Sequence, residues 1–137
     1  MVWALADSGS AAHVADVLKQ FPGATIRESE AQRLGVKYVG ATGDETANRG
    51  EADICFLTPD GQQRVTTFQN ATVGMPIRSI SKVTAEGNYV MFGDKGGYIF
   101  HVETGQLTPL IKRLGVYFVQ LKVPRKLVEQ GFTGLAP

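Results

Sequence analysis

The sequence predicts a mostly β fold with one or two short helices, and three observations support this. Hydrophobic types make up 43% of the 137 residues and charged types 20%, so we expect one globular domain with a substantial core. Sixteen glycines and six prolines exceed the usual share of about 12% for these turn-formers. Short apolar runs closed by turn residues recur along the chain, which favours many short strands.

The first element expected is a strand over residues 2–6, because this apolar run stops at Asp7. Residues 7–10 follow as a turn of small, hydrogen-bonding residues with one glycine. Over residues 11–21 apolar side chains recur at the spacing of one helix face, and Pro22-Gly23 would end that helix. The mixed, polar stretch that follows predicts little.

The central part of the chain predicts two hairpins. Residues 36–57 have apolar ends around a polar tip at 41–45. Asp60-Gly61 is a strong two-residue turn signal between the end of this hairpin and a strand over residues 65–68.

The last part of the chain predicts one further helix and three strands. Residues 76–87 hold apolar side chains at helical spacing, and Gly87 stands where a helix C-terminus favours a positive φ. The strands are expected over residues 89–92, 98–102 and 116–123, with glycine turns at 93–97 and 103–105.

Composition and charge exclude several classes of function. The formal charge of +1 gives no electrostatic reason to expect a nucleic-acid partner. No apolar run approaches the ~20 residues of a membrane span, so no membrane partner is expected. One cysteine, Cys55, rules out an internal disulfide framework and fits an intracellular, reducing compartment. One cysteine and two histidines are too few ligands for a Cys/His zinc site, and no cofactor or metal is expected.

The segment Asp7-Ser8-Gly9-Ser10 is the strongest chemical feature. An apolar strand delivers a carboxylate into a glycine turn that small residues continue. The motif alone also describes an ordinary β-turn, and that interpretation stays open. A carboxylate directly after a buried strand loses hydration, and this costs free energy unless a partner compensates for it. This context favours a functional role for Asp7.

This segment, the His13-Val14 that follows it and Pro22-Gly23 resemble the active-site region of retropepsins, the dimeric aspartic proteases of retroelements. The similarity is greatest to copia-type retrotransposon proteases. Residues 39–44 and 48–51 are similar to the flap of the family, and residues 75–81 and 86–92 to the block that follows the flap in the copia branch.

The resemblance implies a protease domain over residues 1–102 with the family's closed β-barrel. Residues 103–137 would then supply C-terminal strands and a tail, which form either part of a dimer interface or a polyprotein remnant. The implied protein is an aspartic endopeptidase that cuts a retroelement polyprotein, in the cytoplasm or within retroelement particles. Its expected partners are a second copy of the chain and an extended peptide substrate.

By the same resemblance, Asp7 is the catalytic residue. Carboxylate-based peptide hydrolysis needs two carboxyl groups that share one water and one proton, and the chain has one Asp-Ser-Gly. A homodimer would therefore pair Asp7 of each subunit on the two-fold axis. Ser8 would brace the pair across that axis, Gly9 would bring its amide close to the carboxylates, and Ser10 would support the turn.

A flap would bind the peptide by strand addition. The residues assigned to it are Val39, Gly40, Ala41, Thr42, Gly43 and Asp44. A solvated edge hairpin is the alternative for this segment.

Two other classes remain possible at the level of sequence. The first is a catalytically inactive retropepsin fold kept for dimerisation or peptide binding. The second is an unrelated, monomeric small β-barrel in which Asp-Ser-Gly is a coincidence.

The remaining distinctive residues favour structural roles. His13 is expected to be structural rather than the partner of a nucleophilic serine, because no Gly-x-Ser-x-Gly pattern is present. His101 fits the alternation of a strand. Residues 93–97 lack the ending of a phosphate loop and predict a hairpin turn. Trp3 is expected to pack in the core or at a subunit interface.

Overall fold

The computed structural model describes residues 1–40 and 43–124, and this part of the chain is mostly β, as expected. The strands are β1 (Val2–Asp7), β2 (Val14–Ala15), β3 (Lys37–Val39), β4 (Glu45–Ala47), β5 (Glu51–Leu57), β6 (Gln63–Asn70), β7 (Ile77–Ser79), β8 (Asn88–Gly93), β9 (Gly96–His101), β10 (Leu107–Arg113) and β11 (Val116–Leu121). The helices are α1 (Val17–Gln20), α2 (Glu30–Arg33) and α3 (Ile80–Ala85). In these two ranges, no helix has the length and apolar character needed to cross a membrane.

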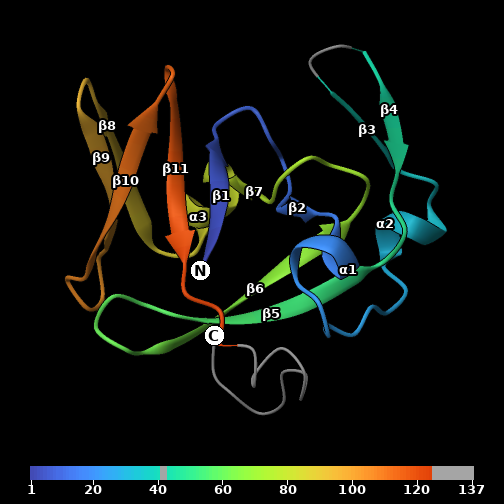
Figure 1. Cartoon of the computed structure of the whole chain (residues 1–137), viewed down its shortest axis with the longest axis horizontal. Coiled ribbons are helices and arrows are strands. Elements are labelled where there is room, and N and C mark those ends of the chain that lie inside the picture. Colours follow the sequence, from blue (N-terminus) through green and yellow to red (C-terminus); the bar gives the residue numbers. More distant parts are fainter. Residues whose placement is uncertain (41–42, 125–137) are drawn as a thin grey trace.

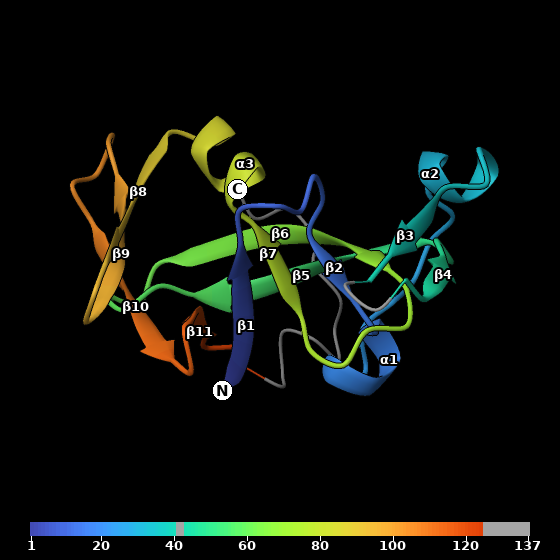
Figure 2. The ribbon, with the colours of Figure 1, turned by 90° about the horizontal axis from the view of Figure 1, so that it is seen from above.

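Nine strands form one strongly bent sheet, in the order β5-β6-β2-β7-β1-β11-β10-β9-β8, and β3 and β4 form a separate hairpin. In Figure 1, β1 and β8 to β11 stand upright while the β5–β6 hairpin crosses below them. Seen from above, α3 lies on one side of the sheet, and α2 with the β3–β4 hairpin lies at the far end (Figure 2).

The expected closed barrel is not seen in the described residues. The sheet order leaves β5 and β8 as end strands. One isolated bridge, between Leu57 and Lys122, joins the end of β5 to the chain just after β11. Closure is limited to that bridge because β9 and β8 continue the sheet outward from β10 instead of turning back toward β5.

Strand β7 lies between β1 and β2, the two strands that flank the loop of residues 8–13. It runs parallel to β1, with Asp7 opposite Ser79, and antiparallel to β2, with Val14 opposite Ile77. A strand far along the chain therefore holds both ends of this loop in place.

The helix expected over residues 11–21 is shorter than the periodicity indicates. Its first half forms β2, because β6 takes up the backbone there: Gln69 donates its amide to the His13 carbonyl at 2.8 Å, and Ala71 donates to Ala15 at 3.0 Å. Tertiary pairing thus overrides local propensity. Of the predicted apolar face, Phe21 packs on Phe68 with ring centroids 5.2 Å apart, whereas Leu18 is exposed.

The helix expected over residues 76–87 also begins later than predicted, because β7 occupies its first residues. Ser79 ends the strand and caps α3, its hydroxyl accepting a hydrogen bond from the Lys82 amide. Gly87 has a φ of +88° just after the helix, which confirms its expected place.

The two apolar ends of residues 36–57 do not pair with each other, so the single hairpin expected there is wrong. β3 pairs with β4, while β5 pairs with β6 across the Asp60-Gly61 turn, which is confirmed. The chain changes direction between β4 and β5 at Gly50, whose φ is +103°. Residues with a Cβ atom rarely adopt that backbone conformation, so glycine is favoured at this position.

Most late elements follow the sequence expectation, with β8, β9 and β11 and their turns near the predicted ranges. β10 was not expected from the sequence, because Pro109 and mixed polarity hide the alternation of apolar and polar residues in this strand. In the structure it pairs with β9 and β11. α2 was not expected either: Ser29 caps it by accepting the Gln32 amide at 3.0 Å. The tail is expected over residues 124–137, and from residue 125 onward it lies outside the described residues.

Candidate functional site

Asp7 lies at the end of β1, on the face of the strand that points away from the main core. Alternation places Trp3, Leu5 and Asp7 on one face of β1 and Ala4 and Ala6 on the other. Ala4 is fully buried in the core, whereas Trp3 is 41% exposed. The Asp7 carboxylate therefore emerges on a partly exposed sheet face.

The turn after β1 holds this carboxylate in a defined direction. The Gly9 amide donates a hydrogen bond to Asp7 Oδ1 at 2.8 Å. A Cβ on Gly9 would lie 3.3 Å from the same oxygen, so the approach is close. Ser10 Oγ donates to the Ala12 carbonyl at 2.7 Å and tightens the next part of the loop. Ser8 is exposed and lies beside the carboxylate in sequence.

Ser79 anchors the loop from the neighbouring strand. Its side chain is fully buried, and its Oγ donates to the Ser10 carbonyl at 2.6 Å. Its amide donates to His13 Nδ1 at 2.9 Å. Sequence reasoning gave Ser79 no role in positioning Asp7, because only the parallel pairing of β7 with β1 brings it there.

His13 has the structural role expected. Its ring is 5% exposed, and because Nδ1 accepts from Ser79, the neutral ring carries its proton on Nε2. Nε2 has no hydrogen-bond partner among the described residues, and the nearest carboxylate oxygen, on Glu86, is 4.0 Å away. Burial lowers the pKa of His13 below its ordinary value, outweighing the opposite effect of Glu86.

Acidification should therefore destabilise the fold through His13. Because the pKa of His13 is lower in the folded than in the unfolded protein, the unfolded chain binds the proton first as pH falls below about 6.5. Stability should fall by up to about 1.4 kcal/mol per pH unit in that window. Urea unfolding at about pH 7.5 and about pH 5.5 measures it.

His13→Asn should remove this slope, and His101→Asn, at the other histidine, serves as the matched control. An unchanged slope in His13→Asn would contradict the assignment. A separate loss of folding stability is expected at lower pH, where carboxyl groups take up protons. The neighbouring His13 lowers the pKa of Glu86, and Arg27 lowers that of Asp53, so the unfolded chain protonates these two groups first.

The residues assigned to a flap lie on an exposed hairpin. Val39 ends β3 and is exposed, and the Gly40 amide donates to the Asp44 carbonyl at 2.9 Å. Gly43, with φ +87°, donates its amide to the Gly40 carbonyl at 2.9 Å. Ala41 and Thr42 lie outside the described residues. β1 and the hairpin extend toward the same side of the molecule in Figure 1.

A buried amide fixes the base of this hairpin. Asn48 Nδ2 donates to the Tyr38 hydroxyl at 3.0 Å and to Gln69 Oε1 at 2.8 Å. Asn48 Oδ1 accepts from Ser29 Oγ at 2.7 Å and from the Gly50 amide at 2.9 Å. The hairpin thus projects from a hydrogen-bonded junction with β6. The resemblance placed Asn48 in the flap-like segment 48–51 but gave its side chain no structural role.

The fold and the site together define a mostly β protein with one carboxylate-bearing glycine turn that an adjacent parallel strand holds in place. Among the residues that the structure describes, no three His, Cys, Asp or Glu side chains lie together as a metal site. Comparison of the chain with protein-family models, curated proteins and solved structures finds no match.

Proposed function

We propose that the protein is a homodimeric, retropepsin-like aspartic endopeptidase in which each subunit contributes Asp7. The observation that carries the proposal is the oriented Asp7 carboxylate. One of its oxygens accepts the Gly9 amide, and the turn sits at the end of a strand supported on both sides. Such support reduces the reorganisation needed when a reacting water binds.

The face that carries Asp7 also supports pairing with a second copy. Trp3 on this face lines a shallow, largely apolar hollow of about 370 Å³ with Ile111, Arg113 and Phe118. A second subunit packed here would remove exposed apolar surface from water. It would do so on the same face of β1 from which the carboxylate emerges.

The chemistry would need both subunits. Two carboxyl groups in close contact share a single proton, because like charges at that distance cannot both ionise without a large cost. One carboxylate would take a proton from the bound water, and the other, protonated, would donate a hydrogen bond to the scissile carbonyl. The pair would titrate as a unit.

The β3–β4 hairpin suits the role of a flap over an extended peptide. Its strands are short and exposed, while its base is held by Asn48. Backbone groups of such a hairpin would add to a peptide strand, and neighbouring side chains would set specificity. A retroelement polyprotein is the proposed substrate, following the sequence resemblance.

Titration with a pepstatin-type transition-state inhibitor tests this function. The proposal expects saturation at one inhibitor per two chains, with loss of cleavage of an unfolded protein substrate in parallel. Failure to bind, together with no cleavage by a dimer, would favour the inactive dimerisation module. A stable monomer by sedimentation would favour the unrelated β fold.

A further inference from the structure

A cavity of about 610 Å³ lies away from Asp7 on the other side of β7. The β5–β6 hairpin, α3 and the β9–β11 strands surround it. This volume is in the range of small-molecule sites. Its apolar wall includes Phe56, Val83, Ile99 and Leu121, and Thr66 and Thr108 add hydroxyl groups.

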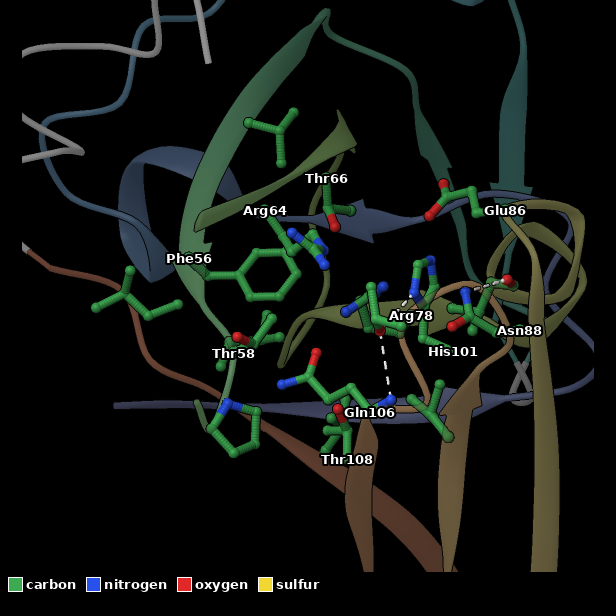
Figure 3. Close-up of a pocket in the computed structure, with 18 of the residues that line it drawn as sticks. Phe56, Thr58, Arg64, Thr66, Arg78, Glu86, Asn88, His101, Gln106 and Thr108 are labelled. Carbon is green, nitrogen blue, oxygen red and sulfur yellow. Dashed lines mark hydrogen bonds between the residues drawn. The ribbon is translucent and has the colours of Figure 1, made fainter. Parts of the chain in front are cut away.

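Arg78 is the unusual group in this cavity, and Figure 3 shows it near the centre of the lining residues. It is 7% exposed, and no described carboxylate oxygen lies within 4.0 Å of its guanidinium. Its Nε is buried without a hydrogen-bond partner in the described residues. The guanidinium carbon lies over the Phe56 ring, 5.4 Å from its centroid, and this cation–π contact satisfies none of the N–H donors of Arg78.

A buried, unpaired cation is costly, so its presence needs a physical reason. Burial lowers the pKa of Arg78 to about 10, which still leaves it charged at neutral pH. Glu86 lines the cavity and attracts Arg78 only at longer range, while its side chain is 55% exposed. Arg64 and His101 also line the cavity, as does Glu103, so the rim is mixed in charge.

We propose that this cavity binds a small organic anion, with its carboxylate or phosphate group on the Arg78 guanidinium and its apolar body against Phe56 and Ile99. The planar fork of arginine pairs with two oxygens of either anion, which accounts for its free donors. The site is separate from the proposed protease function and does not depend on it.

The test uses ¹⁵N-labelled protein titrated with benzoate, phenyl phosphate and the neutral isostere benzamide. The side-chain amides of Asn88 and Gln106, both in the lining, report binding by NMR. Benzoate or phenyl phosphate should give saturable shifts, and which of the two binds more tightly identifies the anion. Benzamide should bind at least about tenfold more weakly, because it lacks the charge.

Three variants sharpen the result. Arg78→Lys keeps the charge but loses the fork, and should bind about tenfold more weakly. Arg78→Met should lose binding, whereas Arg33→Met, at an exposed arginine of α2, should bind as wild type does. Absence of saturable shifts with both anions in the wild-type protein would overturn the proposal, as would equal binding of benzamide. So would unchanged affinity in Arg78→Met.

Discussion

Under the proposed function, replacing Asp7 with Asn should reduce peptide-bond cleavage by about 100- to 10,000-fold while leaving the proposed dimer folded and associated. In the proposed mechanism, an amide at this position could neither accept the proton of the water nor share a proton with the carboxyl group of a second subunit, and loss of acid–base catalysis costs about this much. The turn should survive, because the Asn oxygen can still accept the Gly9 amide that now binds Asp7 Oδ1. Steady-state kcat/KM on a peptide substrate and sedimentation measure the two properties.

Asp94→Asn is the matched control, since Asp94 also lies in a glycine turn, between β8 and β9, and its side chain is 93% exposed. This variant should cleave as wild type does. Equal activity in Asp7→Asn and Asp94→Asn would rule out Asp7 as the catalytic residue.

Gly50→Ala should destabilise the fold by about 2–4 kcal/mol, from overpacking plus a disfavoured backbone conformation. An added Cβ would lie 2.5 Å from the Arg27 carbonyl oxygen and 2.7 Å from Ile26 Cγ2, and the residue has a φ of +103°. The backbone there also donates to Asn48 Oδ1, so any shift loosens the base of the hairpin. The free energy of unfolding in urea measures the loss.

Gly61→Ala separates the two causes. Gly61 has a φ of +87°, but an added Cβ would meet nothing within 4 Å. The cost there should be limited to about 1–2 kcal/mol of backbone strain. If both variants lose the same free energy, the close approach of Gly50 to Arg27 is not a determinant of stability.

Local signals predicted the elements whose partners are near in sequence. The Asp60-Gly61 turn and the strands on either side of it follow from residues within one hairpin. The start of the expected helix at 76–87 did not, because the partner of β7 is β1, some 70 positions earlier. Such strand pairing depends on the arrangement of the whole sheet, and the local pattern of apolar residues does not indicate it.

The residues of the candidate site also differ in how far they could be predicted from the sequence. The Asp7 turn could be predicted because it is formed by three consecutive residues, with the Gly9 amide bonded to Asp7 Oδ1. Ser79 and Arg78 could not be, since their roles come from contacts with a loop and an aromatic ring that lie far from them in the sequence. In the pattern Ile77-Arg78-Ser79-Ile80, the arginine looks like an exposed side chain of an amphipathic element until the strands fold around it.

The distance between the two Asp7 carboxylates in a crystal structure of the protein tests the central claim most directly. The proposed function predicts a two-fold dimer in which these groups lie within hydrogen-bonding reach, at about 3 Å. A monomer, or a dimer that holds the two carboxylates well beyond that reach, would contradict it.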